Sequence, residues 1–364
     1  MKKSILLILG IIVFISCDKN NADDNLINQL GEVCDFKTEI KSPDGFEVNS
    51  IGEIYFNGSV QAFQFLDDEI GYAMLSKNAG GYVEVFKTID GGQTWSNLEI
   101  GINQYPRSIL FKDENFGIIT VLDVTGCPPP NCQNKCVILK TENGGISWEQ
   151  VEFENLKGVL YHLKYDSNGN LYANLKLNDQ SVLMKSVDNG ANWDTLFSSS
   201  NLDFNLVTYS FEIFENKIYI SAKDGEILVI DTNGQLIKTI DIGNSTIWDV
   251  EIIDENNLIV VLPEKVIKSI NGGDTWETIY EESARMIGFD SVDKGLMLLK
   301  KSICPTDVYQ VNDLIASTNN GGFNWIEAEE TTTNLRINFT NSQQMGAGVW
   351  YMMIGNKLLE IKEN

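Results

Sequence analysis

Short apolar runs separated by turn residues follow one another along almost the whole chain. Examples are Ser108 to Phe111, Gly117 to Val121 and Cys136 to Lys140, each followed within a few residues by Asp, Asn or Gly. Runs of this length that end in turn residues predict β-strands. Four such runs recur in each unit of about 45 residues, which is typical of a propeller blade.

One motif marks the same turn in five of these units. It reads Ser/Thr-x-Asp/Asn-x-Gly-x-x-Trp, with the Asp or Asn able to accept backbone N–H bonds and the Gly able to adopt positive φ. The Trp that follows can bury a large apolar surface between neighbouring sheets. We interpret these residues as structural: Asp90 and Trp95, Asn143 and Trp148, Asp188 and Trp193, Asn271 and Trp276, Asn320 and Trp325. Each turn offers too few oxygens for calcium, so we expect no metal and no cofactor.

The spacing of the motifs predicts the number of blades. A long gap between Asp188 and Asn271 contains Asp231-Thr-Asn-Gly234, a sixth turn that lacks the Trp. After Trp325 the chain offers three further strands, and a strand from Cys34 to Ile54 would supply the fourth and remove the open sheet edges. We predict an all-β, seven-bladed β-propeller with four-stranded antiparallel blades in a single domain, residues 34–364. The predicted blades are 55–100, 101–153, 154–200, 201–243, 244–281, 282–330, and 331–364 with the N-terminal strand.

The motif is that of the Asp-box (BNR) repeat, and a second pattern narrows the resemblance. The first strand of several blades ends in Phe-x-Asp-x-x-x-Gly, at Phe65 to Gly71, Phe111 to Gly117 and Phe289 to Gly295. Together with the Gly-Gly-x-Thr-Trp turn, this resembles the photosystem II assembly/stability factor type of Asp-box propeller. The resemblance implies that the Asp-box turns lie on the face away from the ligand site. The wider class also contains sialidases, xyloglucan hydrolases and sorting receptors, so the fold does not define the activity.

The N-terminus has the features of a processing signal. Lys2 and Lys3 precede an apolar run from Ile5 to Ile15, which is short for a bilayer-spanning helix, and Phe14-Ile-Ser-Cys17 resembles a lipobox. We predict a lipoprotein signal peptide at 1–16, lipidation of Cys17 and a polar tether at 17–33. An ordinary signal peptide and a membrane helix are the alternatives. The expected location is the bacterial cell envelope, on a leaflet that the sequence does not specify.

Charge and the single histidine exclude several classes of function. The formal net charge is −24, which disfavours nucleic acid and anionic membrane surfaces, so we expect membrane contact only through the lipid anchor. With His162 as the only histidine, classical zinc sites and histidine-based triads are nearly excluded. We expect His162 to be packed or solvated, not catalytic.

The cysteines after Cys17 are disulfide candidates in an exported protein. They are Cys34, Cys127, Cys132, Cys136 and Cys304. We expect a disulfide within the 127–136 loop, because a short loop suits a local covalent link. A metal site made by the three cysteines of this loop is the less favoured alternative, since no fourth ligand lies nearby.

The three arginines occupy similar positions in the repeat. Arg107 and Arg285 each precede a first-strand Phe by four residues, and Arg336 precedes Phe339 by three. These positions lie on the side opposite the Asp-box turns, together with two long insertions, 123–135 and 300–312. We predict a ligand site for carboxylates or phosphates on this loop face. In the alternative reading each Arg pairs with a nearby acidic residue and stiffens the ring.

Two classes of function remain open. The favoured hypothesis is a non-enzymatic binding or assembly module that presents its loop face to a protein or glycan partner. The alternative is a glycoside hydrolase, either sialidase-like or another Asp-box glycosidase. A sialidase-like Arg-Ile-Pro start is missing, and the nearest string is Arg336-Ile-Asn338 near the C-terminus. Hydrolysis needs two carboxylates roughly 5–10 Å apart, and the sequence singles out no such pair, so we name no catalytic residue.

Overall fold

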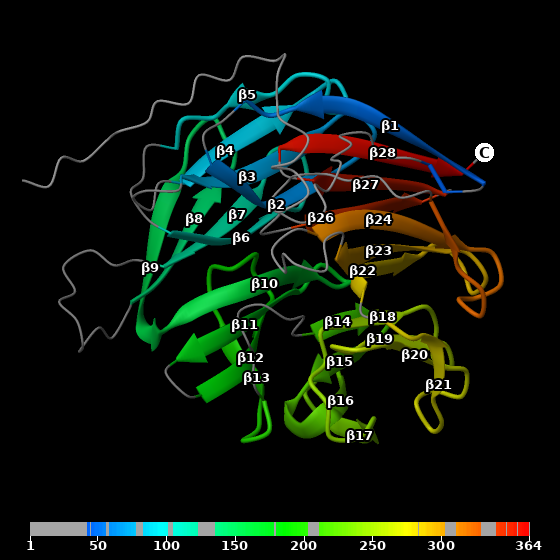
Figure 1. Ribbon diagram of the computed structural model, residues 1–364. Coiled ribbons are helices and arrows are strands. Elements are labelled where there is room, and N and C mark those ends of the chain that lie inside the picture. The colour runs from blue at the N-terminus through cyan, green and yellow to red at the C-terminus, as the bar shows by residue number, and fades with distance from the viewer. Residues whose placement is uncertain are drawn as a thin grey trace, which may run out of the picture.

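The protein is a ring of β-sheets. The computed structural model describes residues 42–43, 45–55, 58–77, 83–100, 105–122, 135–177, 180–202, 211–282, 284–302, 311–328, 340–346, 348–354 and 356–363. These residues form seven four-stranded sheets with antiparallel neighbours, arranged around a common axis (Figure 1). The seven-bladed propeller predicted from the sequence is therefore confirmed.

Six blades are each formed by four consecutive strands. Blade 1 contains β2 (Gly58–Phe65), β3 (Gly71–Lys77), β4 (Val83–Thr88) and β5 (Ser96–Asn97). Blade 2 contains β6 (Tyr105–Phe111), β7 (Gly117–Leu122), β8 (Lys135–Thr141) and β9 (Glu149–Lys157). Blade 3 contains β10 (Val159–Tyr165), β11 (Leu171–Leu177), β12 (Gln180–Ser186) and β13 (Asp194–Ser198).

The second half of the ring repeats this order. Blade 4 contains β14 (Phe211–Phe214), β15 (Lys217–Ser221), the single helical turn η1 (Lys223–Gly225), β16 (Glu226–Asp231) and β17 (Leu236–Asp241). Blade 5 contains β18 (Asp249–Ile252), β19 (Leu258–Val261), β20 (Val266–Ser269) and β21 (Glu277–Tyr280). Blade 6 contains β22 (Ala284–Phe289), β23 (Gly295–Ser302), β24 (Val311–Thr318) and β25 (Ile326–Glu327). No helix among the described residues is long and apolar enough to cross a membrane.

Blade 7 joins the two ends of the described chain. Its strands are β26 (Thr340–Gly346), β27 (Val349–Ile354), β28 (Lys357–Glu363) and, as the outer strand, the N-terminal β1 (Phe46–Glu53). β1 pairs with β28 from Phe46 opposite Glu363 to Glu53 opposite Lys357, which places the N-terminal and C-terminal strands side by side in Figure 1. The Phe46 ring also meets Trp350 edge-on, with ring centroids 5.7 Å apart. Ring closure by the N-terminal strand is confirmed.

The predicted blade boundaries agree with the structure except in blade 2. Its outer strand β9 continues to Lys157, beyond the predicted boundary at residue 153. The reason is a bulge in the β8–β9 pairing, after which Lys135 lies opposite Lys157 and the ladder continues. The outer strand of this blade is therefore longer than the local sequence pattern indicates.

The hydrophobic core lies between the blades. The described residues contain an apolar cluster at each seam between neighbouring blades. At the seam between blades 7 and 1, for example, Tyr351, Met353 and Leu358 pack against Phe65 and Leu75. Because each sheet alone would expose both faces, burial at the seams holds the ring together.

The repeated turns have the hydrogen bonds that their sequence predicts. The Ser or Thr hydroxyl at the start of each turn accepts the N–H of the glycine at 2.8–2.9 Å. The Asp or Asn side chain accepts the N–H four residues later, also at 2.8–2.9 Å. In blade 4, Asp231 accepts the N–H groups of Asn233 and Gln235, which confirms the sixth turn.

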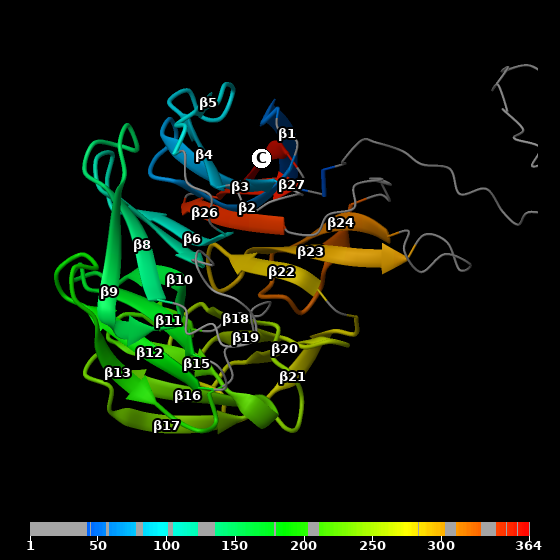
Figure 2. The same ribbon diagram turned by 90° about the vertical axis from the view of Figure 1, so that its left-hand side faces the viewer.

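The two faces of the ring carry different connections. The first strands lie around the axis (Figure 1), where neighbours such as β2 and β6 lie side by side (Figure 2). The side on which these first strands end also carries the repeated turns, and we call it the turn face. On the opposite side, where the first strands begin, lie the ends of the strands that flank the predicted insertions, and we call it the loop face.

Candidate functional site

The predicted arginine site lies largely outside the described residues. Arg107 is at the start of β6, where its guanidinium carbon lies 6.0 Å from the centre of the Tyr161 ring. Its Nη1 donates to the carbonyl oxygen of Pro106 at 3.2 Å, and its buried Nε has no hydrogen-bond acceptor among the described residues. Arg285 is part of β22, and its side chain is not described. Arg336 and most of both insertions lie outside the description, so this site remains a prediction.

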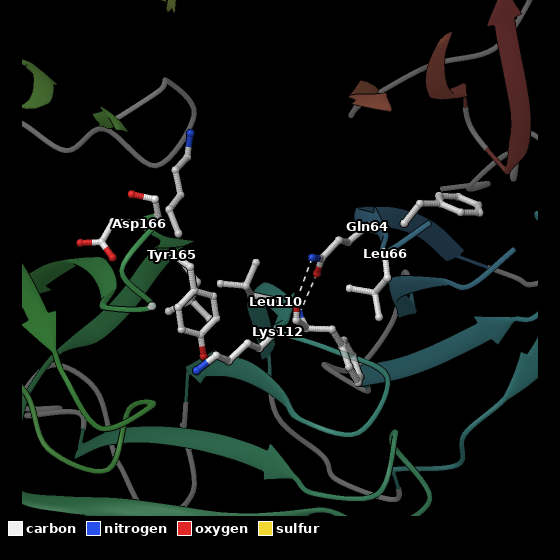
Figure 3. A pocket seen from close by; sticks show the side chains of 12 residues that line it. Gln64, Leu66, Leu110, Lys112, Tyr165 and Asp166 are labelled. Atoms are coloured by element: carbon white, nitrogen blue, oxygen red, sulfur yellow. Dashed lines mark hydrogen bonds between the residues drawn. The ribbon is translucent and has the colours of Figure 1, made fainter. Parts of the chain in front are cut away.

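A pocket lies at the centre of the turn face instead. It has a volume of about 530 Å³ and is open to solvent (Figure 3). Its walls come from the ends of β2, β6 and β10, the first strands of blades 1 to 3. Because side chains alternate along a strand, residues two apart point to the same side, as do Gln64 and Leu66. The lining residues are Gln64, Phe65, Leu66, Leu110, Phe111, Lys112, Leu163, Lys164, Tyr165, Asp166, Ser167 and Gly169.

The pocket combines apolar surface with two ammonium groups. Leu66 and Leu110 contribute apolar surface, and the Lys112 side chain extends towards Tyr165 (Figure 3). The Lys112 Nζ lies 5.4 Å from the centre of the Tyr165 ring and donates to the side chain of Asn189 at 2.8 Å. Lys164, from the next strand, forms an ion pair with Glu212 of β14. The pocket therefore offers positive charge beside apolar side chains in a strongly acidic protein.

The surroundings of Tyr165 and Asp166 set the protonation states of these two pocket residues. Burial, followed by the charges of the nearby acidic loop, raises the pKa of Tyr165 to about 12, so its hydroxyl stays neutral. Burial also raises the pKa of Asp166, but hydrogen bonds from Asn170, Tyr172 and Asn168 lower it by more. Asp166 is therefore an ionised carboxylate that fixes the turn after β10.

Glutamines connect neighbouring first strands beside this pocket. The Gln64 side chain of blade 1 accepts the N–H of Phe111 at 2.7 Å and donates to its carbonyl oxygen at 2.9 Å. Gln343 of blade 7 makes the same pair of bonds to Phe65, at 2.6 Å and 2.7 Å. We call this two-bond arrangement a backbone bridge.

A cluster of acidic groups lies next to Lys164 of the pocket. Asp249 and Glu251 of β18 lie near Glu212, with Lys164 as the neighbouring cation. Burial first, and then the neighbouring carboxylates, raise the pKa of Asp249 well above its usual value and that of Glu251 to about 7. No group of His, Cys, Asp and Glu within the described part of the chain is arranged to hold a metal ion.

His162 lies in a bulge of β10 with an unusual backbone conformation. Its φ is 53°, and its ring nitrogen Nδ1 lies 3.4 Å from the amide nitrogen of Asn174. Burial, followed by the charge of Lys164, lowers the pKa of His162 to about 4, so the imidazole is neutral at physiological pH. The expectation of a packed histidine agrees with this environment.

Cys136 is not part of a disulfide, contrary to its place among the disulfide candidates. Its thiol is free and fully buried in β8, where it packs with Leu160 and Leu163 between blades 2 and 3. Strand alternation directs the side chain into this apolar seam, away from the loop. Burial raises the pKa of the thiol to about 12, which makes it unreactive. Cys17, Cys34, Cys127, Cys132 and Cys304 lie outside the described residues.

Sequence reasoning missed the pocket because it assigned the ligand site to the opposite face. The signal was present in the first-strand motif, because the residues directly before and after each Phe or Tyr line this pocket. These flanking positions are Gln64 and Leu66, Leu110 and Lys112, and Lys164 and Asp166.

Comparisons with known proteins define the fold but not a family. A scan against protein-family models finds no match, and a search of curated proteins finds none. A structure of YCF48 bound to D1 peptide superposes with a TM-score of 0.63 and 15% identity, covering 90% of this chain and 100% of that one. A catalytically inactive virginiamycin B lyase from Staphylococcus aureus with quinupristin gives a TM-score of 0.61 and 12% identity, covering 87% and 99%.

A longer chain among the structural neighbours is matched over about half of its length. The GH74 enzyme from Niastella koreensis gives a TM-score of 0.58 and 14% identity, covering 89% of this chain and 53% of that enzyme. The functions of these neighbours differ, and identities this low carry no information about activity. The comparisons therefore show that the chain is a β-propeller.

Proposed function

We propose that this protein is a non-enzymatic binding module of the cell envelope that holds a segment of a partner protein. The pocket on the turn face is the observation that carries the proposal. It is open, lies at the meeting point of three blades, and places leucine side chains beside two lysines. One of the structural neighbours is YCF48 bound to D1 peptide, which supports a peptide ligand for a propeller of this shape.

The chemistry of the pocket favours a peptide with an apolar residue next to a carboxylate. An apolar side chain would bury surface against Leu66 and Leu110, and a carboxylate would approach the ammonium of Lys112, which lies at the exposed rim. A carboxylate and an ammonium form a charge-assisted hydrogen bond, which is stronger than a bond between neutral groups. The overall net charge of −24 repels acidic segments elsewhere on the protein, which would make the site selective.

A peptide array tests this proposal. Peptides with an apolar residue beside a C-terminal carboxylate are compared with the same peptides ending in an amide. We expect the purified protein to prefer the carboxylates, and Lys112→Glu to weaken their binding at least about tenfold. Lys265→Glu makes the same charge change at an exposed lysine of blade 5 and should leave binding unchanged. Equal binding by the wild-type protein and Lys112→Glu would rule out the pocket.

We also propose that Cys17 carries the lipid that anchors the module. The lipobox-like Phe14-Ile-Ser-Cys17 and the preceding apolar run support this assignment. Cys17→Ser should move the protein from the membrane fraction to the soluble fraction, as followed by immunoblotting of fractionated cells. Continued membrane association of the variant would contradict the lipid anchor.

Glycoside hydrolysis remains the second candidate because of one observation. A carboxyl with a pKa near neutrality is suited to a general acid, and the pKa of Glu251 is raised to about 7. Glu251 does not line the pocket, however, and its carboxylate accepts the N–H of Phe289. Turnover of chromogenic glycosides by the wild-type protein, lost in Glu251→Gln, would favour the hydrolase over the binding module.

A further inference from the structure

Three first strands end in the same local structure. Each ends in a phenylalanine whose ring lies under the glycine that begins the second strand and meets the tryptophan of the same blade edge-on, with ring centroids 6.0 Å apart. The phenylalanines are Phe65, Phe111 and Phe289, in blades 1, 2 and 6. The backbone groups of these three residues are therefore presented to the preceding blade in equivalent positions.

The backbones of two of these three phenylalanines are hydrogen-bonded to a glutamine side chain from the preceding blade. Gln343 and Gln64 form backbone bridges to Phe65 and Phe111, each accepting the N–H and donating to the C=O of the same residue. A primary amide suits this role because it carries an acceptor and a donor side by side. Each bridge satisfies two backbone groups at the end of a strand and joins two blades.

At the third position the bridging residue is a glutamate. Glu251 of blade 5 accepts the N–H of Phe289 through Oε1 at 3.2 Å. An ionised carboxylate has only acceptors, so it cannot donate to the carbonyl oxygen of Phe289. In the neutral form, its O–H takes the place that the amide N–H has in glutamine, and both bonds become possible.

The groups around Glu251 favour the neutral form. Asp249 is on the same strand, and Glu212 lies on β14, on the side of blade 4. Lys164 of β10 is the opposing cation, but it is already paired with Glu212. β22, on the other side, carries Arg285, and β19 contributes only apolar residues. Burial and Glu212 together raise the pKa of Glu251 to about 7, although the Phe289 N–H and Lys164 act in the opposite direction.

We infer that Glu251 is a proton-operated latch between blades 5 and 6, which forms a complete backbone bridge to Phe289 when protonated and releases the carbonyl half of that bridge when ionised. The proton moves between the carboxyl and water, and no other bond changes. Below neutral pH the seam has the same two bonds as the glutamine seams. Above neutral pH it keeps only the N–H bond, so the ring is weakest at this seam.

The expected pH dependence follows from the direction of the pKa shift. In the unfolded chain the Glu251 carboxyl titrates near its usual 4.5, and in the folded ring near 7. Between these values the folded protein binds more protons than the unfolded one, so stability decreases as pH rises through this window. The stabilising contribution is complete below the lower value and lost above the upper one.

Melting temperatures of the wild-type protein and Glu251→Gln test the latch. Glutamine keeps both bonds at every pH, so the variant should melt on the order of 2–4 °C above the wild type at about pH 8.5 and equal to it at about pH 5. The converse variant Gln64→Glu introduces the same group at the seam of blades 1 and 2. It should melt below the wild type, with the larger deficit at the higher pH.

An infrared measurement identifies the titrating group. Near pH 6 the wild-type protein should show protonated-carboxyl absorption from Glu251 and Asp249, and Glu251→Gln should lose the part that titrates near pH 7. Asp249→Asn is the matched variant at the neighbouring carboxyl, which interacts with Glu251, whereas the N–H of Phe289 bonds to Glu251; the change in pH response that Glu251→Gln causes should therefore be the same when Asp249→Asn is also present. The latch is overturned if Glu251→Gln and the wild type change in parallel with pH. A pH response that disappears in Asp249→Asn but persists in Glu251→Gln would also overturn it.

Discussion

At the scale of single residues, lysines on the strands that flank the repeated turns connect each blade to the next; Lys185 and Lys268 precede the turn of their blade, and Lys238 follows it. Lys185, Lys238 and Lys268 donate to the backbone carbonyl oxygens of Thr232, Gly272 and Gly321, each in the turn of the following blade. Lys268 is only 3% exposed, and its Nζ lies over the Phe289 and Phe323 rings. The lysine in the repeat therefore has a structural role, which its charge alone would not indicate.

Lys268→Met should weaken the seam between blades 5 and 6. The methionine keeps the apolar stem, but the carbonyl oxygen of Gly321 loses its charged donor, so we expect a loss of about 1–3 kcal/mol in the free energy of unfolding, measured by urea denaturation. Lys265→Met removes an exposed lysine from the same blade and should change stability by less than about 0.5 kcal/mol. Similar losses in the two variants would show that the bond to Gly321 contributes little.

His162 should make the ring less stable in acid. Its pKa is about 4 in the folded protein and 6.5 in the reference state, so the unfolded chain binds more protons between these values. Stability is therefore lost as pH falls from about 6.5 towards 4, opposite in direction to the effect of Glu251. Asparagine tolerates the positive φ of this position, so His162→Asn removes the imidazole without straining the backbone. Between pH 7 and pH 5, the melting temperature of this variant should fall less than that of the wild type. An equal fall would show that a group other than His162 causes the loss of stability in acid.

At the scale of the element, the Phe-x-Asp-x-x-x-Gly pattern has a steric cause. The phenylalanine that ends the first strand places its ring against the glycine that begins the second strand. A Cβ at Gly117 would lie 2.5 Å from the Phe111 ring, and one at Gly295 would lie 2.8 Å from the Phe289 ring. Glycine is required here because of ring packing, and the motif therefore marks the hairpin that shapes the turn face.

Gly117→Ala tests this packing. The new methyl group must displace the Phe111 ring, which also stacks on Tyr72 at 3.4 Å between centroids, so we expect a loss of about 1–3 kcal/mol in stability. Gly288→Ala is the matched control within a first strand. Its Cβ would lie 3.6 Å from the Trp350 indole, an ordinary contact, and its effect should be within about 0.5 kcal/mol of zero. Equal stability of both variants in urea would contradict the steric account.

At the scale of the whole molecule, β1 holds the ring closed. It covers the edge of β28, and Phe46 contributes to the apolar seam between blades 6 and 7. Without β1, the hydrogen-bonding groups along β28 would form an exposed sheet edge, which promotes association with other chains.

Two truncations separate the strand from the segment before it. A chain starting at Ser42 keeps β1 and should remain monomeric with one cooperative melting transition, as measured by light scattering and calorimetry. A chain starting at Tyr55 lacks β1 and should associate or lose cooperativity. If the shorter chain stays monomeric and melts in the same way, closure does not depend on this strand.

The sequence by itself determined the number of blades, the position of each repeated turn and the strand that closes the ring. These features depend on local chemistry: Asp231 and its counterparts satisfy backbone groups within four residues, and strand length and alternation are read from neighbouring positions. The resemblance to assembly-factor propellers agrees with this fold, whereas the lipid anchor and the arginine site stay predictions.

Only the tertiary structure decided which residues meet at the axis. Gln343 bridges to Phe65 across 278 positions of the chain, and Glu251 reaches Phe289 across 38. The pocket combines side chains from three blades, and Cys136 faces an apolar seam instead of a disulfide partner. Such contacts depend on ring closure and on the register of each blade, so they cannot be predicted from a local sequence pattern. The burial that raises the pKa of Glu251 likewise exists only once the seven blades have assembled.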